Sequence, residues 1–122
     1  MIELKKTDLE GILLTISVFS QPKEGEQQRM IGGLLTEEVT LGTKRNLQKI
    51  HKVAMEAYKE YVEDIKKLVE ECKEDKEKLE IEFKVLQEEN VKLEVEPIKL
   101  SFLENVSTKN NYNFDLIDKF AV

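Results

Sequence analysis

Cys72 and His51 are the only cysteine and the only histidine of the chain, so they are the first candidates for chemistry. A reactive thiolate needs a nearby base and a positive environment. His51 lies about three heptads before Cys72, and glutamates flank the cysteine. Met55 occupies the i+4 position of His51, where a helical metal pair would need a second ligand. We expect a buried, structural Cys72, a surface His51, and neither a metal nor a cofactor.

Acidic residues are too frequent for adjacent carboxylates to indicate catalysis. Charged residues make up 36% of the chain, and pairs such as Glu70 and Glu71 form a solvated face in most helices of this composition. Gly32 and Gly33 are not followed by the Lys-Ser/Thr of a phosphate-binding loop. The sequence therefore predicts a protein that is not an enzyme.

Four basic residues, Lys44, Arg45, Lys49 and Lys52, gather in one short stretch. Arg45, Lys49 and Lys52 share a helical face, so they could contact a phosphate group or an acidic partner. Residues 56–90 contain thirteen acids against seven lysines, so internal pairing or simple solvation is the alternative. The cluster is our candidate site for an anion or a partner protein.

Length and composition restrict the class of protein. The chain has 122 residues, 40% hydrophobic content and a formal net charge of −6, which favours one folded domain and disfavours direct nucleic-acid binding. No stretch approaches the roughly 20 apolar residues that span a bilayer. The segment "GILLTISVF" is short, acidic residues precede it, and no small-x-small cleavage site follows. We expect no membrane association and a cytosolic location.

The N-terminal segment predicts a strand followed by a helix. Residues 1–5 alternate apolar and polar side chains, as in a half-buried strand. Thr7 and Glu10 have the spacing of a capping box, and apolar residues from Leu9 to Phe19 then lie on one helical face. The β-branched content of "LLTISVF" leaves a strand as the alternative.

A long helix follows, and its continuation decides the architecture. Apolar residues recur every three or four positions in an extended seam. They are Leu47, Ile50, Ala54, Ala57, Tyr61, Ile65, Leu68 and Cys72, with Leu79, Phe83 and Leu86 resuming the spacing after a polar gap. A reversal near residues 73–77 would fold the second group onto the first as a hairpin. The alternative is a continuous rod on the order of 70 Å long, which would need an assembly to cover its seam.

Past Asn90 the apolar period changes from helical to two, which predicts a strand in residues 91–100 in which Pro97 ends the ladder or forms a bulge. This strand could pair with residues 1–5. Asn113 can cap a last short helix that carries Phe114, Ile117 and Phe120. The predicted fold is mainly α with minor β, in one domain: strand and helix (1–20), helical hairpin (34–90), then strand and C-terminal helix (91–122).

This order of elements, with the segments "KRNLQKI", "LEVEPIKLS" and "FDLIDKFAV", resembles an uncharacterised family of small proteins encoded by phages and prophages of low-GC Gram-positive bacteria. The resemblance covers roughly residues 34–121. Family members often carry a polar insertion between the two helical segments, which supports the hairpin, although this chain has almost no insertion there. The family has no established activity, so the resemblance implies no catalytic residue.

Two functions follow as expectations. The first is a non-enzymatic phage-type protein that acts through helical protein–protein contacts, as an inhibitor of a host defence protein or as a structural or assembly component of the particle. It would reside in the host cytoplasm or in the phage particle. The alternative is an oligomeric module that binds a phosphorylated small molecule, such as a nucleotide, near Lys44, Arg45, Lys49 and Tyr58. Val53, Val62 and Val69 widen the seam on its flanks, so we also expect a homo-oligomer.

Overall fold

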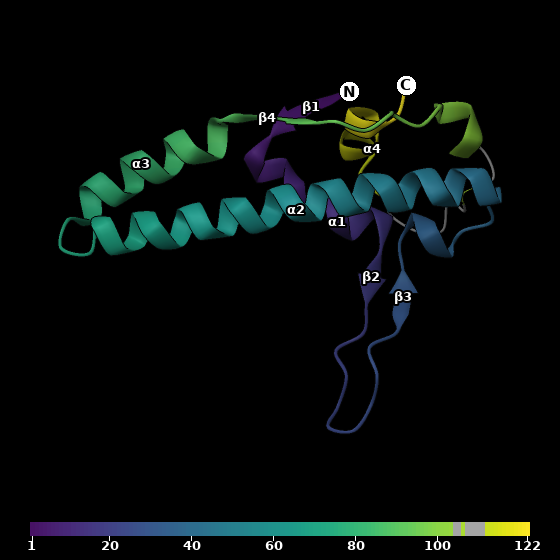
Figure 1. Ribbon diagram of the computed structural model, residues 1–122, viewed down its shortest axis with the longest axis horizontal. Helices are drawn as coiled ribbons and strands as arrows, with labels where there is room; N and C mark the ends of the chain where they lie inside the picture. Colours follow the sequence, from purple (N-terminus) through teal and green to yellow (C-terminus); the bar gives the residue numbers. More distant parts are fainter. Residues whose placement is uncertain (104–105, 107–111) are drawn as a thin grey trace.

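The longest helix of the computed structural model, α2 (Leu41–Glu71), runs along most of the length of the molecule (Figure 1). The structure describes residues 1–103, 106 and 112–122. In chain order the other elements are β1 (Ile2–Lys5), the 3₁₀ turn η1 (Lys6–Asp8), α1 (Leu9–Ile16), β2 (Val18–Phe19), β3 (Met30–Gly32), the 3₁₀ turn η2 (Leu34–Thr36), α3 (Lys76–Glu88), β4 (Asn90–Leu93), the 3₁₀ turn η3 (Leu100–Leu103) and α4 (Phe114–Phe120). This architecture confirms the predicted fold class, mainly α with minor β.

Helix α2 begins where a side chain caps it. The Thr40 hydroxyl accepts a hydrogen bond from the Thr43 amide at 3.2 Å, which satisfies one of the free N–H groups of the first turn. The helix therefore begins at Leu41, and Gly42 lies inside its first turn. From Leu47 onward the predicted seam faces the interior.

Helices α2 and α3 form the predicted hairpin and not a continuous rod. Residues 72–75 separate them, and the Asp75 amide donates to the Cys72 carbonyl at 3.0 Å to close the turn. The Asp75 carboxylate then accepts from the Lys78 amide at 3.0 Å and caps α3. This charged segment contains no apolar residue after Cys72 to hold it against the core, so it can turn in solvent.

Strands β1 and β4 pair antiparallel, as predicted, with Ile2 opposite Leu93 and Leu4 opposite Val91. Ile2, Leu4 and Leu93 are buried, so one face of this small sheet belongs to the core. The pairing brings the start of the chain to the end of the α2–α3 hairpin.

The predicted strand over residues 91–100 is wrong beyond Leu93. Pro97 has no N–H for a ladder, and the segment after it pairs with the C-terminus instead. The Ile98 amide donates to the Phe120 carbonyl at 3.0 Å, and the Val122 amide donates to the Ile98 carbonyl at 2.7 Å. Ile98 thus forms a parallel bridge with Ala121 and not with β1.

The predicted N-terminal cap is also wrong. Residues 6–8 form a 3₁₀ turn, and the Asp8 carboxylate accepts from the Lys5 amide at 3.1 Å, so Thr7 does not cap the helix. Helix α1 ends at Ile16 because the backbone becomes extended at Ser17. The helix predicted to continue to Phe19 is therefore too long.

Strands β2 and β3 form a narrow β-hairpin that projects away from α2 (Figure 1). The predictions did not include this β-hairpin. Gly33 follows it with φ of 95°, and a Cβ at this position would lie 2.5 Å from the Ile16 carbonyl oxygen. The chain therefore needs a glycine where it returns to the body.

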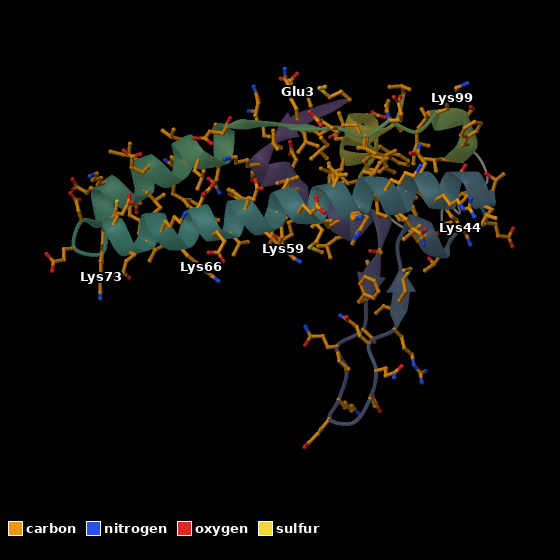
Figure 2. The ribbon with its side chains drawn as sticks, in the orientation of Figure 1. Glu3, Lys44, Lys59, Lys66, Lys73 and Lys99 are labelled. Carbon is orange, nitrogen blue, oxygen red and sulfur yellow. The ribbon has the colours of Figure 1, made fainter. Side chains whose placement is uncertain are left out.

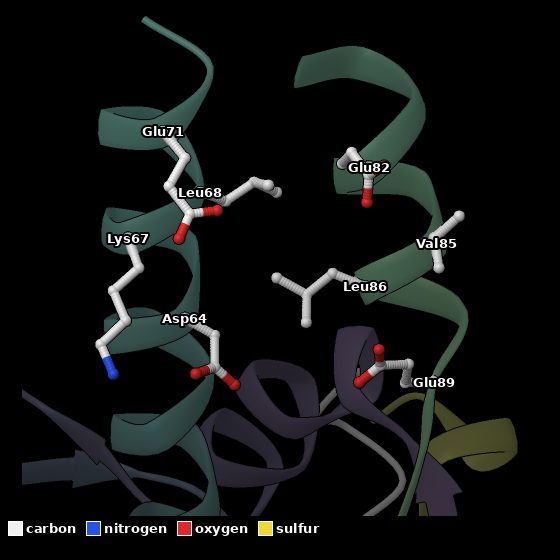
Figure 3. Close-up of a pocket in the computed structure, with 8 residues that line it drawn as sticks. All are labelled: Asp64, Lys67, Leu68, Glu71, Glu82, Val85, Leu86 and Glu89. Carbon is white, nitrogen blue, oxygen red and sulfur yellow. The ribbon is translucent and has the colours of Figure 1, made fainter. Parts of the chain in front are cut away.

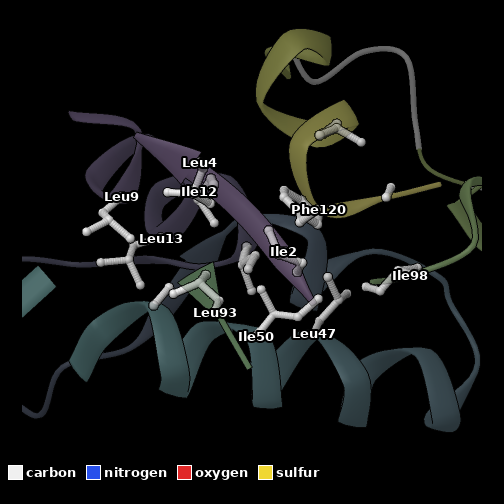
Figure 4. Close-up of a cluster of buried hydrophobic side chains, with 14 of the residues drawn as sticks. Ile2, Leu4, Leu9, Ile12, Leu13, Leu47, Ile50, Leu93, Ile98 and Phe120 are labelled. Carbon is white, nitrogen blue, oxygen red and sulfur yellow. The ribbon is translucent and has the colours of Figure 1, made fainter. Parts of the chain in front are cut away.

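The core gathers around the first half of α2. Figure 4 shows side chains from β1, α1, α2, β4 and the C-terminal segment converging there. The largest fully buried side chains are Phe120, Leu9, Ile12, Ile16, Leu34, Leu47, Ile50, Leu93 and Ile98. Asn113 caps α4 as predicted, accepting from the Asp115 amide at 3.0 Å, and α4 contributes Ile117 and Phe120 to this core.

Candidate functional site: the helical hairpin

The second half of α2 and all of α3 extend past the main core as a two-helix arm (Figure 1). Among the fully buried side chains of α2, the last along the chain is Ala54, and residues such as Ile65 and Leu68 are only half-buried. Two helices alone cannot enclose a full interior. The arm is therefore the part of the molecule whose apolar residues are least covered.

Helix α3 carries apolar residues on two faces. Leu86 is buried against α2, and Leu79 and Phe83 are half-buried beside it, as the hairpin prediction requires. Ile81 and Val85 lie one turn apart on another face, with 63% and 56% of their surface exposed. A surface helix normally has one apolar stripe, so the second stripe has no partner within the described residues.

A groove runs between the two helices on one side of the arm (Figure 3). Leu68 and Leu86 point toward one another at its floor, and Val85 forms one wall. The groove has a volume of about 170 Å³. Its other lining residues are charged: Asp64, Lys67, Glu71, Glu82 and Glu89. We call these eight residues the acidic groove.

Lys6 connects the base of this groove to the N-terminal turn. Its ammonium donates to the Glu89 carboxylate at 2.7 Å and lies 3.7 Å from an Asp64 carboxylate oxygen. The hydrogen bond to Glu89 is the main reason that the pKa of Lys6 is raised, and the partial burial of Lys6 opposes that shift. Lys5 also pairs with Glu88. These contacts attach the C-terminal end of α3 to the N-terminal segment of the chain.

The opposite side of the arm holds a second, more aromatic groove of about 220 Å³. Tyr58 and Tyr61 lie in its wall with ring centroids 6.5 Å apart, and Phe83 faces them from α3. Burial raises the pKa of the Tyr61 hydroxyl. The remaining lining residues are Lys6, Thr7, Glu10, Val62, Ile65 and Gln87.

The predicted basic cluster lies at the other end of α2. Arg45, Lys49 and Lys52 are exposed, whereas Lys44, which is labelled in Figure 2, is half-buried. None of the four forms an ion pair within the described part of the chain, so the proposed internal pairing with the acidic half is not seen there. Tyr58, which the nucleotide hypothesis places beside this cluster, lines the aromatic groove instead.

Cys72 and His51 occupy different environments. Cys72 is buried at the hairpin turn, as predicted for a structural cysteine. His51 is half-buried, so it is less exposed than a typical surface residue, and this burial lowers its pKa. The described residues include no group of three or more His, Cys, Asp and Glu side chains that could hold a metal ion.

Lysines lie on the outer side of the second half of α2 and in the turn that follows it. Figure 2 shows Lys59, Lys66 and Lys73 on the side that faces away from α3. Lys66 lies 3.7 Å from the Glu63 carboxylate, one turn earlier. Acids and lysines alternate here, so this side forms an ordinary solvated helix face.

The sequence predictions missed the second apolar face of α3. They followed the 4-3-4 seam of Leu79, Phe83 and Leu86, and Ile81 and Val85 fall outside that seam at i and i+4. A count of apolar residues on every face of the helix, and not only on the seam, would have found them.

Comparison with protein families, with characterised proteins and with solved structures finds no match to this chain. The resemblance to a phage-encoded family therefore stays a prediction. None of the helices in the described residues combines the length and the apolar character needed to cross a bilayer.

Proposed function

We propose that the chain is a non-enzymatic, phage-type protein that acts through helical protein–protein contacts, and that α3 is its main contact element. The partner is a protein of the host or of the phage. One observation carries the proposal: Ile81 and Val85 form an exposed apolar stripe on a helix whose opposite face already packs on α2.

The position of the stripe supports this role. It lies on the arm that projects beyond the core, where a partner can approach without meeting the rest of the body (Figure 1). A partner helix that covered both side chains would gain roughly 1.5–3 kcal/mol for each one fully buried. That is a typical contribution of anchor residues to a helix-mediated interface.

The proposal can be tested by capturing binding proteins from a host lysate with the tagged chain and with matched variants. We would compare tagged wild type with Ile81→Ser/Val85→Ser and with the control Leu14→Ser/Ile31→Ser, whose residues are similarly exposed, at 54% and 65%, but lie outside the arm. Quantitative mass spectrometry should find a protein that wild type and control retain and that the α3 variant loses. The same protein, once purified, should bind wild type directly with at least tenfold higher affinity than the α3 variant.

Retention of every captured protein by the α3 variant, with its circular dichroism unchanged, would refute α3 as the contact element. Mass spectrometry of purified particles separates the two versions of the function. A stoichiometric presence in particles supports a structural or assembly component, and absence from particles supports an inhibitor of a host protein.

A further inference from the structure

Helices α2 and α3 leave the apolar part of the acidic groove incompletely covered. Leu68 is only half-buried, and Val85 keeps 56% of its surface exposed, although both residues line the groove (Figure 3). Ile81, one turn before Val85, continues this exposed apolar surface along α3. Two packed helices bury the residues of one shared seam, whereas a third helix laid along the groove would also cover its floor and wall.

The net charge of the chain is concentrated in the same part of the molecule. Residues 70–89 span the end of the arm and contain nine acidic residues against four lysines, a net charge of −5. The whole chain has a net charge of −6, so the remainder is nearly neutral. The arm is therefore the region that attracts a positively charged partner most strongly.

The lining of the acidic groove has the same sign of charge. Four carboxylates surround its apolar floor, and Lys67 is the one cation among its eight residues. Lys6 pairs with two of these carboxylates. The other two, Glu71 on α2 and Glu82 on α3, form no ion pair within the described part of the chain. They flank the floor from both helices and are available to a partner (Figure 3).

We propose that the acidic groove binds a basic amphipathic helix of the partner protein. The apolar stripe of that helix covers Leu68, Val85 and Leu86, and its Lys or Arg side chains lie against Glu71 and Glu82. A cavity of about 150 Å³ can hold a benzene molecule. The groove, at about 170 Å³, therefore has room for one Leu or Phe anchor of the partner. This inference rests on the proposed function, because it takes the arm to be the protein-binding element, and it adds the chemistry of the bound segment.

The charges of the groove distinguish this partner from others. An acidic helix or a nucleic acid would bring more negative charge to a surface that already has an excess of carboxylates. A purely apolar helix would remove water from Glu71 and Glu82 without giving them a hydrogen-bond donor. A helix with positive residues beside an apolar stripe satisfies both the floor and the carboxylates. Salt screens exposed ion pairs, so binding should weaken as the ionic strength rises.

Three synthetic peptides test this chemistry on the purified full-length chain. The first is an amphipathic helix with leucine on its apolar face and lysine at its polar positions. The second has glutamate in place of lysine, and the third has serine in place of leucine. Fluorescence anisotropy measures the affinity of each peptide. We expect the lysine–leucine peptide to bind, and each of the others to bind roughly tenfold or more weakly, because each lacks one of the two interactions.

Matched charge variants locate the binding site. The groove variant, Glu71→Gln/Glu82→Gln, should bind the lysine–leucine peptide roughly tenfold more weakly than wild type does. The control, Glu70→Gln/Glu80→Gln, loses the same charge from the same two helices at exposed residues outside the groove, and should bind like wild type. Circular dichroism checks that both variants keep their helices. In amide NMR spectra of wild type, the peptide should shift resonances of the acidic groove and not that of Tyr58, on the opposite side of the arm.

Three results would overturn the inference. The first is an equal loss of affinity in the groove variant and its control, because the attraction is then to the overall charge of the arm. The second is a groove variant that binds the peptide like wild type. The third is a wild-type dimer in sedimentation equilibrium that the groove variant dissociates, because the groove then holds a second copy of the chain.

Failure of this inference and failure of the proposed function can be told apart. The peptide measurements leave Ile81 and Val85 intact. If the peptide does not bind while the α3 stripe still captures a protein, only the chemistry assigned to the partner is refuted. If the peptide binds in the groove while Ile81→Ser/Val85→Ser loses no captured protein, only the proposed function is refuted.

Discussion

The hairpin turn is the most direct place to perturb the fold, because it separates the two helices of the arm. We consider insertion of Gly-Ser-Gly-Ser between Lys73 and Glu74. This position leaves Cys72 in its buried site and keeps the Asp75 cap of α3 adjacent to its helix. The insertion lengthens a connection of four residues, 72–75, to eight.

The expected cost of the insertion is small. Doubling a loop costs about 0.6 kcal/mol in closure entropy. The Asp75-to-Cys72 backbone hydrogen bond of the turn is also lost, at about 0.5–1.5 kcal/mol. The free energy of unfolding should therefore fall by only about 1–2 kcal/mol.

The same four residues placed inside α2, between Lys66 and Lys67, provide the control. They would rotate Leu68 by about 40° and move it by about 6 Å along the axis relative to the preceding helix. Two glycines in a helix interior cost about 2 kcal/mol before any packing is lost. Separation of Leu68 from Leu86 adds to this, so the total should reach about 4 kcal/mol or more.

Urea denaturation followed by far-UV circular dichroism measures both costs. The protein concentration is held constant, because self-association would change the apparent stability. A turn insertion that cost as much as the insertion in α2 would refute the assignment of residues 72–75 as a solvent-exposed turn. It would also remove the argument that the two helices pack as a hairpin.

Three further outcomes follow from the structure. Leu47→Ala should lower the free energy of unfolding by about 2–5 kcal/mol in urea titration because Leu47 is fully buried, whereas Leu41→Ala should stay within about 0.5 kcal/mol. Gly33→Ala should lower the melting temperature by an amount that corresponds to at least about 1 kcal/mol, because alanine is strained at φ of 95° and its Cβ would meet backbone atoms. An unchanged melting temperature would contradict this geometry. The pKa of Lys6 is raised in the folded state, so its ion pairs stabilise the protein fully below the unfolded pKa of about 10.4. This contribution is lost as the pH rises through the higher folded pKa. The difference in melting temperature between wild type and Lys6→Met should therefore stay constant near neutral pH and shrink over that alkaline interval.

Local signals in the sequence were sufficient for the buried face of α2 and for the start of α4, but not for the bounds of α1. The regular spacing of Leu47, Ile50 and Ala54 identifies the buried side of α2, because one face of a helix repeats every three or four residues. Asn113 identifies the start of α4, because its cap is a contact between near neighbours in the chain. The turn after Cys72 could also be expected from the local sequence, because the charged residues 73–78 include no apolar side chain to bury.

Contacts between distant segments could not be read from local patterns. Ile98 alternates with its neighbours in the same way whether it pairs with β1 or with the C-terminal segment, and the structure selects Ala121. Residues 6–8 form a 3₁₀ turn in place of the predicted Thr7 cap, and this turn contacts α3, a segment about 70 residues further along the chain. A period of two or of 3.6 determines which side of an element is apolar, but not which segment covers it.

The candidate site also combines features that the local sequence determines with features that only tertiary packing determines. The sequence alone determined that Lys44, Arg45, Lys49 and Lys52 form a basic cluster, because these residues are neighbours on one helix. Only the tertiary structure decided that the acidic groove exists, because its walls come from two helices whose relative rotation depends on how the hairpin closes. The 4-3-4 spacing already predicted that Leu86 faces α2, whereas the groove depends on which residues of α2 the helix α3 lies against.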